Sequence, residues 1–213
     1  MIAAVIFDLF GTLLDVRNRQ NPYRQLLRIG AQQGRAASPN DLRIVMALNG
    51  GIREAAEAFG IHLSPAQMAD LGSMLARELE SICLIDDAMP AIGLLQEHGV
   101  KVAVCSNLAG PYCSKARSLL PGLDAYALSA ELGLLKPDPG IYRSTCTMLG
   151  VLPGQVVGSN SSQVLMIGDS RRCDEQGPRC FGILGHHLDR TGGGGIRDLI
   201  SFAEAIIENA SDS

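Results

Sequence analysis

Long apolar runs are missing from this sequence of 213 residues. None reaches the roughly 18 residues that a membrane-spanning helix requires. The first residues, MIAAVIFDLFG, also lack the basic start of a signal peptide. Lysines and arginines are scattered singly rather than gathered in a stripe, and the net charge is −4, which argues against nucleic acid as a partner. We therefore expect a cytoplasmic protein that contacts neither membranes nor nucleic acid.

Paired cysteine motifs are missing too, because the six cysteines show no CxxC spacing. In a reducing compartment we expect free thiols, several of them in the core, and no zinc site. Hydrophobic residues make up 46% and charged residues 19% of the chain, which is ordinary for a globular protein. The length suits one domain with a full core and a sizeable insertion.

Three apolar runs without polar alternation predict buried parallel strands: AAVIFD (3–8), VKVAVCSN (100–107) and QVLMIGDS (163–170). Two weaker candidates are AYALSA (125–130) and CFGILG (180–185). Helix-like stretches lie between these runs, at 89–99, 110–122 and 138–151, and each ends near a glycine. Strands and helices that alternate in this way predict an α/β fold with a doubly wound parallel sheet.

Residues 17–86 break this alternation. They contain no convincing strand and predict four amphipathic helices, at 21–34, 40–50, 52–60 and 64–81. We therefore predict a core domain formed by 1–16 and 87–213, and a helical cap domain formed by 17–86. The turn-rich segments 153–162 and 190–195 predict loops.

Polar residues follow the predicted strands at the points where the strands end: Asp8, Ser106, Asn107, Asp169 and Ser170. Ligands of open α/β sheets bind beyond the carboxyl ends of the strands, so we expect these residues in one crevice. Asp8 is the candidate nucleophile, because a carboxylate can form a covalent intermediate that water then releases.

Two further carboxylates, Asp169 and Asp174, complete a candidate metal site. Mg²⁺ prefers oxygen ligands and keeps several waters, so we expect Asp8 and Asp169 as direct ligands and Asp174 as a ligand through water or a supporting group.

Three other residues suit a phosphoryl substrate. Ser106 and Asn107 can donate hydrogen bonds to a phosphoryl oxygen, and Lys136 can neutralise charge on the transferring group and on the nucleophile.

Four motifs occur in order: DLFGT (8–12), SN (106–107), KPD (136–138) and GDSRRCD (168–174). The set resembles the haloacid dehalogenase superfamily, whose members are mostly phosphatases, and it covers nearly the whole chain. The resemblance implies a Rossmann-like core with a helical cap of the first insertion type. It also implies that the backbone carbonyl of Phe10 joins Asp8 and Asp169 around Mg²⁺, and that Asp15 lies near the hinge to the cap.

Phe10 departs from the family pattern. In phosphatases of this superfamily the residue two positions after the nucleophile is normally an aspartate, which acts as general acid on the leaving group. Phenylalanine cannot donate that proton, and general acid–base catalysis typically contributes about 10²–10⁴-fold. We therefore expect a phosphate monoester with an alkoxide leaving group to be a poor substrate.

Three interpretations remain open. The complete metal motif favours a Mg²⁺-dependent phosphohydrolase acting on a small activated phosphate such as an acyl phosphate. Phe10 also suits a 2-haloacid dehalogenase, where an aromatic Tyr is common at this position, but those enzymes need no magnesium and usually replace Gly-Asp of the fourth motif. A dehalogenase would also need a halide-binding arginine, for which Arg28, Arg35 and Arg43 are in range. The third interpretation is a degenerate, non-catalytic member that binds a phosphorylated ligand.

Overall fold

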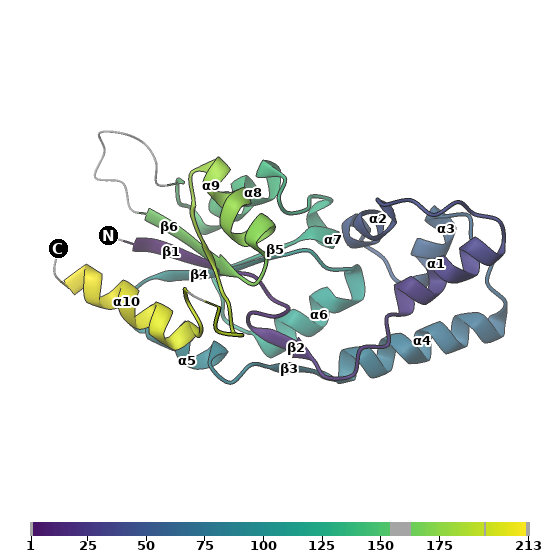
Figure 1. Cartoon of the computed structure of the whole chain (residues 1–213), viewed down its shortest axis with the longest axis horizontal. Helices are drawn as coiled ribbons and strands as arrows, with labels where there is room; N and C mark the ends of the chain where they lie inside the picture. The colour runs from purple at the N-terminus through teal and green to yellow at the C-terminus, as the bar shows by residue number, and fades with distance from the viewer. Residues whose placement is uncertain (1, 154–162, 194, 212–213) are drawn as a thin grey trace.

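A five-stranded parallel sheet forms the centre of the protein (Figure 1). The computed structural model describes residues 2–153, 163–193 and 195–211. The strand order is β5-β4-β1-β6-β7, and every neighbouring pair is parallel. The strands are β1 (Ile2–Phe7), β4 (Lys101–Ser106), β5 (Ala125–Leu128), β6 (Gln163–Gly168) and β7 (Leu184–His187). The predicted parallel α/β sheet is confirmed.

Helices cover both faces of this sheet, which explains why its strands are apolar without alternation. Val5 and Phe7 of β1 belong to a cluster with α5 (Ala88–Glu97), α6 (Gly110–Leu119) and α10 (Leu199–Ser211). Ala4 and Ile6 point to the other face, where they pack with α8 (Pro139–Leu149). Figure 1 shows α5 and α10 on one side of the sheet and α8 and α9 (Gly177–Phe181) on the other.

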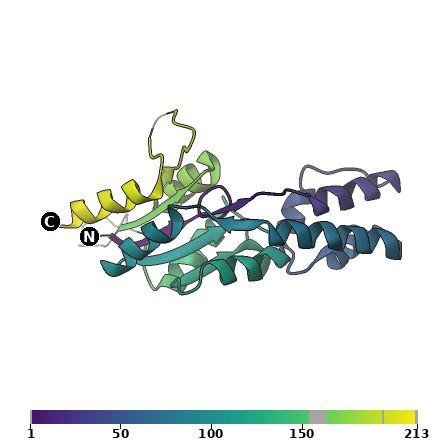
Figure 2. The same ribbon diagram turned by 90° about the horizontal axis from the view of Figure 1, so that it is seen from below.

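Four helices inserted after β1 lie at the end of the sheet opposite to both termini (Figures 1 and 2). They are α1 (Pro22–Gln32), α2 (Asp41–Ala47), α3 (Ile52–Ala58) and α4 (Pro65–Glu80), and we call residues 22–80 the helical unit. A two-stranded antiparallel sheet of β2 (Leu14–Val16) and β3 (Ile82–Leu84) carries the chain in and out of this unit. Within the described residues, no helix is both long and apolar enough to cross a membrane.

Local signals in the sequence set the boundaries of α4. Ser64 precedes Pro65, and its side chain accepts a hydrogen bond from the backbone N–H of Gln67 at 3.2 Å. The Gln67 side chain in turn accepts from the backbone N–H of Ser64 at 2.9 Å. This reciprocal capping satisfies two donors that the first turn of a helix leaves unpaired.

The structure corrects two predictions about strands. Residues 17–86 were expected to contain no strand, but β3 lies there, and a strand of three residues is too short to show a period of two. The strand predicted at 180–185 starts later, at Leu184, because Gly177–Phe181 forms α9.

The sequence analysis also missed α10, the short helix α7 (Ser129–Leu132) and the π-helix η1 (Arg171–Gln176). The loop predicted at 153–162 lies outside the described residues beyond residue 153. The six cysteines are free thiols, as expected.

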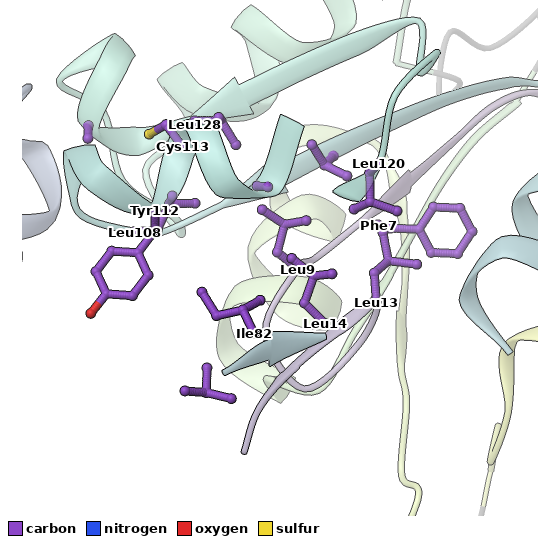
Figure 3. Close-up of a cluster of buried hydrophobic side chains, with 14 of the residues drawn as sticks. Phe7, Leu9, Leu13, Leu14, Ile82, Leu108, Tyr112, Cys113, Leu120 and Leu128 are labelled. Atoms are coloured by element: carbon purple, nitrogen blue, oxygen red, sulfur yellow. The ribbon is translucent and has the colours of Figure 1, made fainter. Parts of the chain in front are cut away.

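The turn after β1 rests on a buried cluster (Figure 3). Leu9, Leu13 and Leu14 are fully buried and belong to one cluster with Ile82 of β3 and Tyr112 of α6. The Leu9 carbonyl accepts hydrogen bonds from the backbone N–H groups of Leu13 and Leu14, both at 2.8 Å. Asp8, which precedes Leu9, and Phe10, which follows it, are therefore held in one position at the carboxyl edge of the sheet.

Candidate active site

The carboxyl ends of three adjacent strands bring the motif residues together. Asp8 follows β1, which lies between β4 and β6, and its backbone N–H donates to the Ile167 carbonyl of β6 at 3.0 Å. Ser106 is the last residue of β4, and Asp169 directly follows β6. Residues far apart in the sequence thus meet at one edge, as the strand assignment predicts.

Lys136 lies between two carboxylates in the interior. Its Nζ donates to Asp8 Oδ1 at 2.7 Å and to Asp174 Oδ1 at 2.6 Å, and the residue is only 3% exposed. Burial alone would lower the pKa of Lys136, but the charges of Asp8 and Asp174 outweigh it and raise that pKa above its usual value. The lysine therefore stays protonated and fixes the orientation of the Asp8 carboxylate.

Three carboxylates surround this single cation. Oxygens of Asp8, Asp169 and Asp174 all lie within 4.8 Å of one another. Burial and the charge of Asp8 raise the pKa of Asp169. Burial, opposed by Lys136 and reinforced by Asp8, raises the pKa of Asp174 to about 6. Among the residues that the structure describes, Lys136 is the only lysine bound to these carboxylates. Negative charge is therefore in excess in the cluster, and a divalent cation would balance it.

Gly11 allows Asp169, the exposed carboxylate of the cluster, to approach the turn after β1. A Cβ at this position would overlap the Asp169 carboxylate, and the Gly11 φ of 86° lies in the left-handed region. Both features require glycine. The Gly of the first motif therefore sets the distance between the loops that carry Asp8 and Asp169.

Asp174 is held by the protein on both oxygens. Its Oδ1 accepts from Lys136, and its Oδ2 accepts from the backbone N–H of Ser170 at 2.9 Å. Asp174 lies in the π-helix η1 and is fully buried, whereas Asp169 is exposed. This arrangement supports a direct contact of Asp169 with a ligand and a supporting role for Asp174.

Asn107 contacts Lys136 instead of pointing freely into the crevice. Its Nδ2 donates to the Lys136 carbonyl at 2.9 Å, and its Oδ1 accepts from the Lys136 backbone N–H at 2.8 Å. These paired bonds fix the backbone that carries the lysine. We expected Asn107 to hold phosphate; in this structure its amide positions Lys136, and one N–H of the amide is left for a substrate. Ser106 is 2% exposed.

Phe10 forms part of the wall of a cavity of about 280 Å³ between the sheet edge and the helical unit. Its ring packs edge-on against Tyr112, with the ring centroids 6.0 Å apart. Asn107 also lines this cavity. Asp15, by contrast, lies on β2, where it is exposed and accepts a hydrogen bond from the Val16 backbone N–H.

The three arginines that the sequence places in range of a halide, without choosing among them, do not line this cavity. Arg35 forms two hydrogen bonds with Asp41 and stacks on Phe59 at 4.4 Å, and this pairing holds the pKa of Asp41 at about 2. Arg28 and Arg43 are exposed and do not line the cavity.

Arg19 and Arg24 line the cavity instead. The sequence could not single out these two, because scattered single arginines on a helical segment carry no spacing signal that separates lining residues from solvated ones.

The five-stranded parallel sheet and the cluster of carboxylates at its carboxyl edge agree with the family that the four motifs resemble. A family model for haloacid dehalogenase-like hydrolases matches residues 2–182. The chain belongs to this family of hydrolases, as the four motifs predict.

Relatives of known activity include both phosphatases and dehalogenases. The chain is 27% identical over 181 residues to (S)-2-haloacid dehalogenase 1 of Pseudomonas sp. (strain CBS-3), a match that covers 75% of this chain and 77% of that protein. It is 26% identical over 142 residues to phosphoserine phosphatase of Thermus thermophilus, covering 65% of this chain and 53% of that protein.

Solved structures show the same fold. A HAD phosphatase from Thermococcus onnurineus is 21% identical, with a TM-score of 0.64 over 96% of this chain and 98% of that one. A 2-haloacid dehalogenase from Pseudomonas syringae is 18% identical, with a TM-score of 0.67 over 98% of this chain and 99% of that one.

Proposed function

We propose that the protein is a cytoplasmic, Mg²⁺-dependent phosphohydrolase that uses Asp8 as nucleophile on a small activated phosphate such as an acyl phosphate. The observation that carries this proposal is the cluster of three carboxylates around one lysine. The core would comprise 1–16 and 87–213, and residues 17–86 would form the cap that covers the substrate.

The donor set fits Mg²⁺, which binds hard oxygen ligands and keeps several waters. Asp8, Asp169 and the backbone carbonyl of Phe10 would be ligands, and Asp174 would act through water. When bound, the ion would offset the negative charge of the phosphoryl oxygens. Asp169 is better placed than Asp174 to bind the ion directly. It is exposed beside Asp8, whereas both oxygens of Asp174 already accept hydrogen bonds within the protein.

The chain's own residues supply the chemistry in two steps. One oxygen of the Asp8 carboxylate bonds to phosphorus as the bond from phosphorus to the leaving oxygen breaks, which gives an aspartyl phosphate. Water then attacks that phosphorus, the bond to Asp8 breaks, and phosphate leaves with the water proton while the carboxylate is restored. Lys136 holds Asp8 in position and, with Ser106, stabilises the transferring group.

Phe10 restricts the leaving group. An acyl phosphate releases a carboxylate, which is stable without a proton, whereas an alkoxide is not. A site with phenylalanine at this position therefore suits the first kind of substrate and not the second.

A second candidate function is hydrolysis of 2-haloacids. It is favoured by the aromatic Phe10 and by the 27% identity to a Pseudomonas haloacid dehalogenase. Halide leaves without protonation, so the missing acid would have no consequence. The exposed Asp169 weighs against this candidate, because a third carboxylate beside Asp8 would repel a carboxylate substrate unless a cation were bound.

Two assays separate these functions. Acetyl phosphate should be hydrolysed with Mg²⁺ and not with EDTA. L-2-chloropropionate should release no halide in either condition. Halide release that persists in EDTA, together with no hydrolysis of acetyl phosphate, would reverse the assignment.

The raised pKa values of the cluster predict how stability depends on pH. Asp174, at about 6 in the folded protein against 3.8 as a free side chain, favours the folded state when protonated. In EDTA, the contribution of Asp174 to the free energy of unfolding should therefore be greatest below about pH 4. It should be lost as the pH rises through 6. Mg²⁺ binds the ionised carboxylates, so the stabilisation it gives should grow over the same range. Thermal unfolding from pH 4 to 7.5, with Mg²⁺ and with EDTA, measures both curves; a Mg²⁺ effect independent of pH would contradict the assigned ligands.

A further inference from the structure

The chain that leaves β7 contacts both loops of the candidate active site, and we call residues 187–190 the tie segment. β7 pairs with β6 so that His187 lies opposite Gly168. The backbone N–H of Leu188 donates to the Gly168 carbonyl at 2.8 Å. The tie segment therefore begins beside the loop that carries Asp169.

His187 holds the backbone of Asp169. Its Nε2 lies 3.1 Å from the Asp169 carbonyl oxygen, and because a carbonyl can only accept, this nitrogen donates the hydrogen bond. Since the bond is made to the backbone, the Asp169 carboxylate remains available beside Asp8.

Arg190 holds the turn after β1. Its Nη2 donates to the Thr12 carbonyl at 2.8 Å, across 178 positions of the sequence. Thr12 directly follows Gly11, the residue whose missing Cβ leaves room for the Asp169 carboxylate. Arg190 and His187 thus connect the turn after β1 to the loop after β6.

A buried carboxylate fixes the Arg190 guanidinium. Asp87 Oδ2 accepts from Nη1 and Asp87 Oδ1 accepts from Nη2, both at 2.8 Å, so the pair is bidentate. Asp87 Oδ2 also accepts from the backbone N–H of Leu199, the first residue of α10, at 2.9 Å. Burial opposes the charge of Asp87, but Arg190 and the Leu199 N–H outweigh it and lower the pKa of Asp87. The carboxylate therefore stays ionised and keeps Nη2 directed at Thr12.

A short turn also fixes the backbone that carries Arg190. The two carboxylate oxygens of Asp189 accept from the backbone N–H groups of Thr191 and Gly193, both at 3.1 Å. An isolated ion pair at the surface contributes little to stability. The Arg190 side chain is only 29% exposed, its pair with Asp87 is bidentate, and its Nη2 has a second acceptor. These features support a role in positioning the turn after β1.

The two loops need such a connection because their carboxylates repel each other. Oxygens of Asp8 and Asp169 lie within 4.8 Å of one another. Two ionised carboxylates at this separation favour moving apart until a cation binds between them. Donors bonded to the backbone carbonyls of both loops oppose that movement and leave the carboxylates free to bind the cation.

We propose that Arg190 is a positioning residue for the reaction at Asp8. Fixed by Asp87, it holds the turn after β1, while its neighbour His187 holds the loop after β6, and the oxygen ligands of one cation stay within reach of each other. The inference rests on the proposed function, since that function supplies the cation. Arg190 touches neither substrate nor ion and acts through the backbone of the turn.

Binding of Mg²⁺ alone tests this role apart from turnover. In calorimetric titrations of metal-free protein, Arg190→Gln should raise the dissociation constant of Mg²⁺ at least about ten-fold, because loss of a group that supports metal ligands typically costs about 10–100-fold in affinity. Equal dissociation constants in Arg190→Gln and the unchanged protein would overturn the inference.

Another bidentate arginine–aspartate pair provides the matched control. Arg35→Gln breaks the two hydrogen bonds to Asp41, at 2.8 and 2.5 Å, in the helical unit. Its dissociation constant should stay within about two-fold of the unchanged protein, because distant sites act independently. A rise in Arg35→Gln equal to that in Arg190→Gln would attribute the effect to general destabilisation and would overturn the positioning role.

A double substitution tests whether Asp87 acts through Arg190. Asp87→Asn alone should also weaken Mg²⁺ binding, because the bidentate pair is lost. Added to Arg190→Gln, it should weaken binding no further, since residues of one network do not act additively. Additive losses would contradict action through the guanidinium.

Hydrogen exchange in the metal-free protein separates this inference from the proposed function. The backbone N–H groups of Gly11 and Leu13 donate within the turn after β1, both at 2.8 Å. They should exchange about ten-fold faster in Arg190→Gln and at an unchanged rate in Arg35→Gln.

The combined results assign any failure to one claim or to both. If the unchanged protein binds no Mg²⁺ but exchange in the turn depends on Arg190, the proposed function fails and the positioning role stands. If Mg²⁺ binds and acetyl phosphate is hydrolysed, while neither the dissociation constant nor the exchange depends on Arg190, the inference fails and the function stands. If Mg²⁺ does not bind and exchange is the same in both proteins, both fail.

Discussion

Replacing Asp8 by Asn should lower the hydrolysis of acetyl phosphate by at least about 10³-fold, because the amide cannot form the aspartyl phosphate. The substitution keeps the size of the side chain. Lys136 keeps Asp174 as a partner at 2.6 Å, so the fold should persist. Release of phosphate from acetyl phosphate in saturating Mg²⁺ measures the effect, and circular dichroism checks the fold.

A surface carboxylate provides the control for this substitution. Asp15→Asn changes the same functional group seven positions away on β2, where the side chain is exposed and outside the cluster. Its rate should stay within about two-fold of the unchanged protein. Residual activity of Asp8→Asn above a few per cent, with the fold intact, would remove Asp8 from the nucleophile role.

Replacing Phe10 by Asp should raise the hydrolysis of a phosphate monoester such as glycerol phosphate, by up to about 10²–10⁴-fold if the missing general acid alone limits it. The ring of Phe10 packs against Tyr112 in the cavity wall beside the site, so a carboxyl at this position would lie on the leaving-group side. The rate for acetyl phosphate should change little, because its leaving group needs no proton.

Packing must be separated from acid catalysis in this experiment. Phe10→Leu removes the contact with Tyr112 without supplying an acid, so it should not gain monoesterase activity. A gain in Phe10→Leu equal to that in Phe10→Asp would attribute the change to a wider cavity. An unchanged rate in Phe10→Asp would locate the deficit outside residue 10.

The sequence predicts the parts of the fold in which one apolar run forms one buried element. The runs that became β1, β4 and β6 carry Asp8, Ser106 and Asp169 at their ends, and parallel strands bring such ends to one edge of the sheet. Sequence spacing could not predict that a three-residue strand, β3, pairs with β2, or that a π-helix holds Asp174. Both depend on contacts with distant segments.

Side-chain partners in the site were the least predictable feature. Nothing near Asn107 in the sequence indicates that its amide holds the backbone of Lys136, 29 positions along the chain. The same holds for Tyr23 of α1, whose buried hydroxyl has no hydrogen-bond partner among the described residues, which the sequence does not indicate. Tertiary contacts decide these roles, whereas motif order decides the family.

The central claim, a Mg²⁺ site that works together with Asp8 on phosphate, is tested most directly by thermal unfolding with Mg²⁺ and beryllium fluoride, a phosphoryl mimic that binds a carboxylate nucleophile. At concentrations about a hundred-fold above the dissociation constant, ligand binding should raise the melting temperature of the unchanged protein by about 5 °C or more. Asp8→Asn should lose the increment due to beryllium fluoride. No shift in the unchanged protein, or an equal shift in Asp8→Asn, would contradict the account.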